Sequence, residues 1–295
     1  MRDSYVRALL VAGAAVAIVA GSITLGAQTE FNNNLKFNSG QDVQPVFEGW
    51  ARRPDGGFDL YFGYLNRNWV ETLHIPVGPN NRFESGDPDQ GQPTFFYTRT
   101  NRKVFTVQVP SDFGQKELVW TLTANGSTRT VYGHLRPDWE ITPDGGASGG
   151  TKTTQEARSN RAPSLAIASV APVRLPSTAT LAATVSDDGL PVPRRSTPAV
   201  GQETPPGLSG DLKETPTNLP WLSGNGRRRG SGLGVDWFVF RGPADVRFDP
   251  ERSTPAGGKA TTTASFSEPG EYVIRVGAAD GLLTTFQDVT ITVTR

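Results

Sequence analysis

The sequence predicts an all-β protein: two antiparallel β-sandwich domains joined by a flexible linker, after an N-terminal signal peptide. Three observations lead to this prediction. Apolar and polar residues alternate over many short segments, as half-buried strands require. Clusters of Asn, Asp, Gly and Pro separate these segments. Residues 142–161 carry Gly, Ser, Thr and charge with almost no apolar residue, and they divide the chain into two such regions.

Length and composition narrow the classes of protein that fit. A chain of 295 residues can hold two domains that each bury a core. Lys plus Arg equals Asp plus Glu, at 29 each, so no net field attracts nucleic acid. The chain has no Cys, so it has no disulfides and no lipid attachment at a cysteine. An exported protein of this kind must rest on packed cores, which suits a bacterial envelope protein.

Residues 1–27 are predicted to be a signal peptide. Arg2 and Arg7 make a basic start, an uncharged apolar stretch follows, and Leu25-Gly26-Ala27 offers small residues for cleavage. The alternative is an uncleaved anchor, because the apolar stretch is just long enough to span a bilayer and would tether the chain to a membrane. Either reading places the protein outside the cytoplasm, in the periplasm, at the cell surface or secreted.

The first domain is expected over residues 44–141, with about seven strands and no helical period. Asn125-Gly126 between two alternating segments is a strong signal for a hairpin turn. The expected strands lie at residues 46–50, 58–65, 69–77, 103–109, 118–123 and 128–135.

The second domain is expected over residues 162–295. A long insertion at residues 190–232, rich in Pro, Gly, Arg and Thr, interrupts it, and a loop of that length is either functional or disordered. Arg227-Arg228-Arg229 in this insertion is predicted to be a charged tip of the loop. The expected strands lie at residues 181–185, 234–240, 244–248, 260–266, 272–278 and 286–293.

Four segments of the second domain resemble the PKD-type and related immunoglobulin-like repeats of bacterial surface proteins. They are Leu181 to Gly189 with its Ser-Asp-Asp-Gly end, Val235-Asp236-Trp237, Ala264 to Tyr272, and Ala279-Asp280-Gly281. The resemblance implies a seven-stranded immunoglobulin-like sandwich. It places Trp237 in the core and Tyr272 at the corner before the penultimate strand.

The first domain resembles a domain of exported bacterial proteins to which no activity is assigned. The resemblance rests on Phe47 to Trp50, Phe62 to Asn68, Ile75 to Asn81 and Leu118 to Gly126. It implies no reaction, cofactor or ligand.

The chain offers little for catalysis. His74 and His134 are its only histidines, and each reads as a surface residue of a strand. Without Cys, the common zinc sites lack ligands. No nucleophile elbow, phosphate loop or dinucleotide fingerprint occurs. We therefore expect no enzyme activity, no catalytic residues and no cofactor.

Two groups of acidic residues have a second interpretation besides turn formation. Asp87 and Asp89 lie among turn formers, although paired acids can also hydrolyse glycosides or hold Ca²⁺. Asp187, Asp188 and Asp280 are expected at one pole of the second sandwich and are candidate Ca²⁺ ligands. The alternative is that these Asp side chains bond the backbone of their own turns.

The aromatic residues of the first domain also have two interpretations. Trp50, Tyr61, Phe62, Tyr64 and Trp69 form either part of the core or a platform on which sugars stack. The predicted function is a non-enzymatic exported structural or binding module, such as an adhesion or scaffold module. A carbohydrate-binding module is the alternative, and a hydrolase with a carboxylate site ranks below it. The partner is a protein or a polysaccharide, and the sequence does not identify ligand-binding residues.

Overall fold

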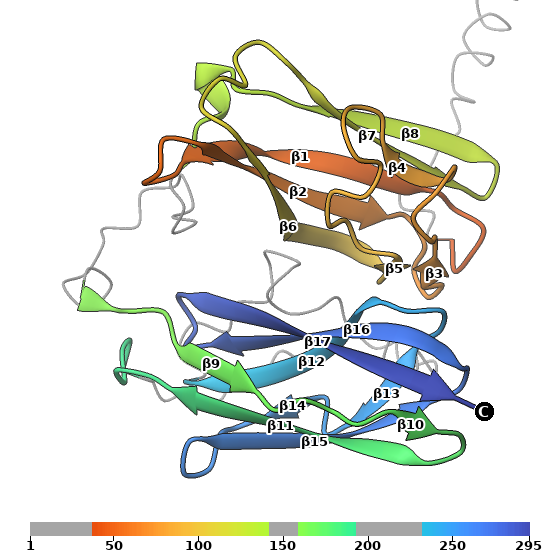
Figure 1. The fold of residues 1–295 in the computed structure, drawn as a ribbon, viewed down its shortest axis with the longest axis vertical. Helices are drawn as coiled ribbons and strands as arrows, with labels where there is room; N and C mark the ends of the chain where they lie inside the picture. Colours follow the sequence, from red (N-terminus) through yellow and green to blue (C-terminus); the bar gives the residue numbers. More distant parts are fainter. Residues whose placement is uncertain (1–36, 142–158, 193–231) are drawn as a thin grey trace, which may run out of the picture. The chain divides into compact units, whose positions relative to one another are not determined.

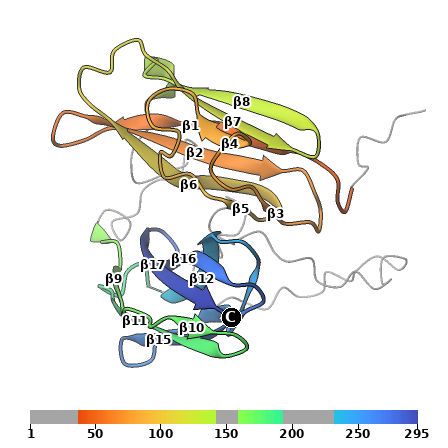
Figure 2. The same cartoon turned by 45° about the vertical axis from the view of Figure 1, so that its right-hand side comes forward.

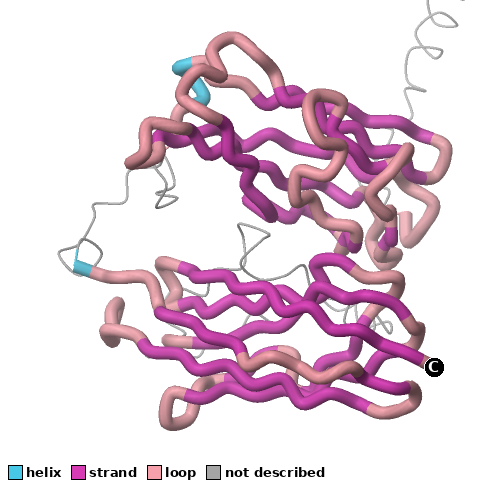
Figure 3. The backbone as a smooth tube through the Cα atoms, in the orientation of Figure 1, coloured by secondary structure: helices cyan, strands magenta, loops and turns pink. Residues whose placement is uncertain are grey.

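The computed structural model describes residues 37–141, 159–192 and 232–295. Within these ranges nearly all regular structure is β-strand, as Figure 3 shows. The predicted signal peptide, most of the linker and most of the insertion at 190–232 lie outside the described residues. Among the described residues, no helix has the length and apolar character needed to cross a membrane.

The first sandwich consists of two three-stranded antiparallel sheets and a short extra pair of strands (Figure 1). One sheet has the order β1-β2-β6, with β1 (Val43–Arg52), β2 (Phe58–Asn66) and β6 (Arg99–Val109). The other has the order β4-β7-β8, with β4 (Asn81–Phe83), β7 (Leu118–Ala124) and β8 (Ser127–Gly133). The extra pair is β3 (Leu73–His74) with β5 (Phe95–Phe96).

The core between these sheets is strongly aromatic. Phe62 of β2 contacts Phe83, Phe105 and Trp120, with ring centroids 5.4–6.1 Å apart. The facing position on β8 is Gly133, where a Cβ would lie 2.6 Å from Cζ of Phe62. The small residue at the end of β8 is therefore required by the large ring opposite it.

Two β-bulges in the β1-β2-β6 sheet meet at one carboxylate. The register shifts between Phe47 and Gly49 on β1, and again near Gly63 on β2. Glu48, the extra residue of the first bulge, accepts a hydrogen bond at Oε1 from the Lys103 backbone N–H at 3.0 Å. A Cβ at Gly63 would overlap that same oxygen. Burial raises the pKa of Glu48, and the bond from Lys103 opposes this.

The second sandwich has the strand order of an immunoglobulin constant-type fold. One sheet runs β9-β11-β15-β13, which corresponds to strands A, B, E and D. The other contains β12, β16 and β17, corresponding to C, F and G, with β10 parallel to β17 and β14 at the edge. The strands are β9 (Ser164–Ile167), β10 (Val173–Arg174), β11 (Thr178–Ser186), β12 (Gly234–Arg241), β13 (Val246–Asp249), β14 (Arg252–Ser253), β15 (Lys259–Phe266), β16 (Gly270–Ala279) and β17 (Thr284–Thr294).

Trp237 and Tyr272 are structural, as predicted. Trp237 lies on β12 in the core and is 3% exposed. Tyr272 lies near the start of β16, fully buried, and its hydroxyl donates to the Glu268 carbonyl at 2.9 Å. This bond to the backbone a few residues upstream is the tyrosine corner of immunoglobulin-type sandwiches.

Two local predictions for the first domain are wrong. Residues 69–77 contain only the two-residue strand β3, because the buried amide of Asn66 bonds the Glu71 and Phe96 carbonyls and holds the chain in a loop. His134 lies outside β8, which ends at Gly133. The chain turns there into a short 3₁₀ helix, η1 (Pro137–Trp139).

Strand β12 connects the two cores. Its alternate residues Val235, Trp237 and Val239 belong to the second core, whereas Phe238 and Phe240 belong to the first. Because both of its faces are covered, every residue of β12 before Arg241 is buried. The described residues from Phe37 onward accordingly belong to one compact unit.

Candidate functional site

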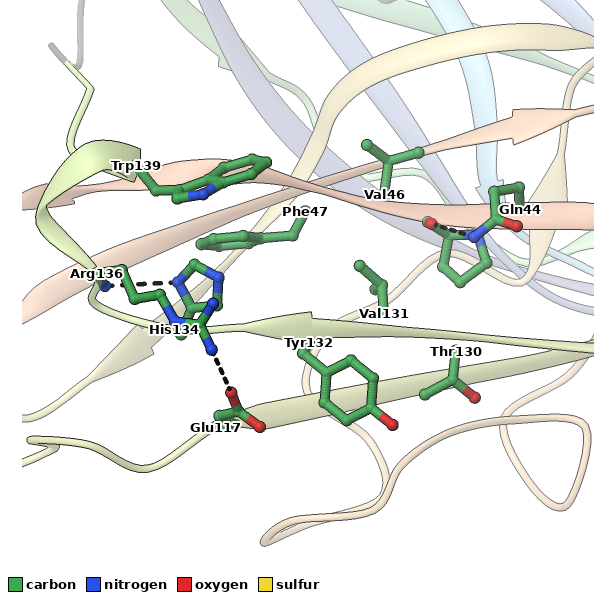
Figure 4. Close-up of a pocket in the computed structure, with 11 residues that line it drawn as sticks. Gln44, Val46, Phe47, Glu117, Thr130, Val131, Tyr132, His134, Arg136 and Trp139 are labelled. Atoms are coloured by element: carbon green, nitrogen blue, oxygen red, sulfur yellow. Dashed lines mark hydrogen bonds and ion pairs between the residues drawn. The ribbon is translucent and has the colours of Figure 1, made fainter.

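A groove of about 580 Å³ opens on the first sandwich where its two sheets end side by side. β1 and β8 are end strands of their sheets and lie next to each other (Figure 2). β1 contributes the segment Gln44 to Phe47, and β8 contributes Thr130 to Tyr132. His134, Arg136 and Trp139 follow β8, and Glu117 precedes β7 (Figure 4).

Local sequence explains why aromatic side chains gather here. Alternation along β8 turns Thr130 and Tyr132 toward solvent, whereas Val131 between them is half-buried. Pro137 begins η1, where its missing N–H costs nothing. The turn is then fixed to β1, because Trp50 Nε1 donates to the Arg136 carbonyl at 2.8 Å. The Ile141 N–H also donates to the Trp50 carbonyl at 2.8 Å.

These anchors place three rings in contact at one end of the groove. Trp139 stacks on Phe47 with ring centroids 5.5 Å apart and an interplanar angle of 27°. His134 meets both rings edge-on, at 5.1 Å from Phe47 and 5.8 Å from Trp139. Figure 4 shows this cluster beside Val46, with Tyr132 farther along β8. Trp139 is 42% exposed and Tyr132 is 53% exposed, so each presents ring surface to solvent.

The polar groups of the groove include a pair of opposite charges. Arg136 lies 3.7 Å from Glu117, and both side chains are largely exposed. The Arg136 N–H donates to His134 Nδ1 at 3.5 Å. Gln44 and Thr130 add an amide and a hydroxyl. The groove therefore offers aromatic surface for stacking and polar groups for hydrogen bonding.

The aromatic residues weighed from the sequence lie elsewhere. Trp50, Phe62 and Tyr64 are buried, which confirms the core interpretation for these three. Tyr61 and Trp69 are partly exposed, and each has a cation over its ring: Lys103 at 5.4 Å and Arg99 at 5.0 Å. The five do not form one exposed platform.

Sequence reasoning missed Tyr132 and Trp139. Strand alternation is the signal that marks Tyr132 as exposed, since it follows Thr128 and Thr130 on the polar face of β8. Trp139 carries a weaker signal, a large aromatic after Arg-Pro-Asp in a turn.

Asp87 and Asp89 do not face each other as a hydrolytic pair. Asp87 Oδ1 accepts the Asp89 N–H at 2.9 Å, which is a turn interaction. Both carboxylate oxygens of Asp89 accept from Arg241, at 2.6 and 2.9 Å. These bonds from Arg241 hold the pKa of Asp89 below its usual range.

Asp187 and Asp280 come close together at the pole of the second sandwich, and both line a hollow of about 360 Å³ there. Burial, followed by the charges of Asp280 and Asp188, raises the pKa of Asp187. Oδ1 of Asp280 caps its own turn by accepting from the Leu282 and Leu283 N–H groups at 2.6 and 2.8 Å.

Asp188 also bonds backbone, accepting from the Arg161 and Leu190 N–H groups. No three His, Cys, Asp or Glu side chains in the described ranges gather closely enough to hold a metal ion. Asp187 Oδ2 likewise accepts the Gly189 N–H at 2.9 Å, and Asp280 Oδ2 accepts from the Asn160 amide at 3.0 Å. Ca²⁺ binding by Asp187, Asp188 and Asp280 stays a prediction.

His74, the other histidine, is exposed at the end of β3, and partial burial of its ring lowers its pKa.

Comparison with known proteins identifies no family. No family model matches the chain, and no curated protein matches it. Solved structures with some likeness include a chimeric titin Z1Z2 functionalized with a decorin peptide, at 17% identity, 46% of this chain, 96% of that chain and TM-score 0.24.

Two further structures are the fibronectin(III)-like modules of Clostridium thermocellum CbhA and domains 4 and 5 of the S-layer protein SbsC. The first is 11% identical, over 85% of this chain and 94% of that one, with TM-score 0.24. The second is 9% identical, over 86% and 98%, with TM-score 0.25. At such TM-scores these likenesses carry no argument. The sheets and strand order of the chain define its class instead. It is an all-β protein of two antiparallel sandwiches, and the second sandwich is immunoglobulin-like.

Proposed function

We propose that this chain is a non-catalytic structural and binding module of the bacterial cell envelope, in which the two sandwiches act as one body. The observation that carries the proposal is the burial of β12 on both faces. A strand at the surface of an independent sandwich has a solvated face and alternates. Here that second face presents Phe238 and Phe240 to the other core.

Polar contacts around β12 support the same conclusion. The Val239 N–H donates to the Tyr97 hydroxyl at 2.9 Å, and the Thr94 N–H donates to the Phe240 carbonyl at 3.2 Å. Arg241 holds Asp89 through two bonds and donates from Nε to the Gln92 carbonyl at 2.9 Å. A bidentate arginine–carboxylate pair fixes the relative orientation of the two groups more strictly than apolar contact alone.

A second arginine extends the contact on the neighbouring strand β16. Arg275 lies 3.4 Å from the centroid of the Phe240 ring and donates to the Val104 carbonyl at 2.5 Å. Its other nitrogens bond both oxygens of Asp288. The carboxylate of Asp288 therefore neutralises the charge of Arg275, whose guanidinium also contacts the first sandwich.

Export is the second part of the proposal. The basic, then apolar, then small-residue pattern of residues 1–27 supports it. A non-catalytic role is consistent with where the acidic candidates lie: Asp89 holds Arg241, and Asp280 caps a turn.

The test is to cut the chain between the sandwiches without removing either. A protease recognition sequence inserted between residues 142 and 158 allows cleavage of the folded protein. We expect the two fragments to co-elute in gel filtration at moderate salt, because the contacts at β12 hold them together. Separation of two folded fragments from the unmutated protein would contradict the one-body proposal.

Variants at the contact sharpen this test. Arg241→Ala combined with Tyr97→Phe removes the carboxylate pair and the phenol oxygen that Val239 bonds. We expect the cut fragments of this variant to separate. The control is Arg247→Ala, which removes an exposed arginine from β13 in the other sheet, and whose fragments are expected to stay together.

A further inference from the structure

We propose that the groove between β1 and β8 binds a neutral glycan chain, with Trp139 and Tyr132 as the rings on which sugar units stack. The site goes beyond the one-body role of the chain and does not depend on it, since all of its residues belong to the first sandwich.

Two exposed aromatic rings lie together in the groove. Exposed apolar side chains that gather at one site, unlike those scattered singly, mark binding surfaces. Trp139 and Tyr132 are both exposed and line the same groove (Figure 4). One face of Trp139 is held against Phe47, and η1 is anchored to β1 through Trp50. The ring is therefore preorganised, and a ligand that stacks on it loses little free energy to ordering the protein.

The lining of the groove mixes apolar and polar side chains. Sugar rings expose C–H groups on their faces and hydroxyls around their edges. The rings of Trp139 and Tyr132 match the faces, and planar polar groups at the rim match the hydroxyls. Gln44 supplies both a donor and an acceptor, Glu117 supplies acceptors, and Arg136 supplies donors. An apolar groove with a few well-placed polar groups is the usual composition of a small-ligand site.

The charges that line the groove are balanced. The lining contains one cation, Arg136, and one anion, Glu117, and they lie 3.7 Å apart. Their fields largely cancel, so the groove does not favour a polyanion over an uncharged polymer. Nucleic acid would require several unpaired cations to neutralise its phosphates. The complementary ligand is an uncharged polysaccharide.

The experiment is affinity electrophoresis of the full chain through gels that contain soluble neutral polysaccharides: a mixed-linkage β-glucan, a xylan, a galactomannan and an α-glucan. Pull-down on insoluble cellulose and chitin adds two further polymers. We expect retardation or depletion by at least one of the six. Polygalacturonate is the charged comparison, and binding to it alone would overturn the proposal.

Variants then locate the site. We expect Trp139→Ala and Tyr132→Ala each to weaken binding about tenfold or more, because each removes a stacking surface. Phe37→Ala is the matched control, since Phe37 is an aromatic residue of similar exposure outside the groove. Its binding is expected to equal that of the unmutated chain. Because Tyr132 is largely exposed, its variant is expected to keep the melting temperature and far-UV spectrum of the parent.

Two outcomes would overturn the inference. One is that none of the six neutral polymers retains the unmutated, folded chain. The other is that binding occurs but remains unchanged in both Tyr132→Ala and Trp139→Ala.

Discussion

Single residues explain much of the stability expected of the second sandwich, and Trp237 is the clearest case. We expect Trp237→Ala to lower the free energy of unfolding by about 3–5 kcal/mol, through lost burial and the cavity left behind. Its indole nitrogen is buried without a hydrogen-bond partner. Trp237→Phe should therefore cost much less, because it removes an unsatisfied donor along with some volume. Urea titration of both variants measures the difference. Equal losses for Phe and Ala would contradict this account.

Asp236 is expected to make the free energy of unfolding fall as the pH rises. Burial raises its pKa to about 7, despite the Arg252 guanidinium 2.9 Å away. In the unfolded chain the same carboxyl titrates near pH 4. Between about pH 4 and 7 the native state therefore binds the extra proton, and the contribution of Asp236 to the free energy of unfolding falls as pH rises through this window.

Asp236→Asn is the variant that measures this contribution. We expect the unfolding free energy of the parent, minus that of the variant, to decline between about pH 4 and 7 and to level off above. Denaturant melts at a series of pH values supply both numbers. Asp138→Asn, on the exposed turn η1, is the control. A difference for Asp236→Asn that is constant with pH would refute the assignment.

Strands on opposite sheets of the first sandwich constrain each other through the sizes of the side chains that face one another. At the end of β8, a Cβ at Gly133 would lie 2.6 Å from the Phe62 ring of β2. We expect Gly133→Ala to destabilise the chain by about 1–3 kcal/mol through overpacking. Phe62→Leu in the same chain should recover part of that loss. A double-mutant cycle with no coupling between the two positions would contradict the packing argument.

The sequence predicts those strands and turns whose signals lie within a few neighbouring residues. The hairpin around Asn125-Gly126 and the strands beside it are confirmed, because alternation and turn residues are local signals. The partners of Asp89 could not be predicted, since Arg241 is 152 residues away in the chain. The loop over residues 69–77 was missed because a buried asparagine amide overrides the apolar alternation of that stretch.

Strand β12 carried a signal that the prediction of two separate sandwiches did not use. Residues 235–240 are apolar without alternation apart from Asp236. A continuous apolar run in an antiparallel sandwich indicates cover on both faces. The groove ring Tyr132 was within reach of the same kind of reasoning, whereas the position of Trp139 depends on a turn anchored by distant backbone groups.

At the scale of the whole molecule, shared burial at β12 predicts shared unfolding. We expect calorimetry of the full chain to give a single unfolding transition. If the first sandwich unfolds, Phe238 and Phe240 become exposed to water, and if the second unfolds, the first core loses both rings. Arg241→Ala with Tyr97→Phe should separate the transition into two. Two well-resolved transitions in the unmutated chain would instead indicate sandwiches that unfold independently.

The carboxylate that joins the two bulges of the first sandwich has a consequence for how this chain can vary. Glu48 Oε1, the Asn101 carbonyl oxygen and Arg102 Cα all lie in the space that a side chain at position 63 would need. Glu48 also accepts a hydrogen bond from the Lys103 backbone. Shortening residue 48 therefore does not make room for a side chain at 63, because the backbone of β6 still excludes it. A short residue at 48 leaves the Lys103 N–H without its acceptor, unless the bulge itself is lost. Position 63 is therefore expected to stay glycine in divergent copies of this domain for as long as the two bulges persist, whichever residue stands at 48.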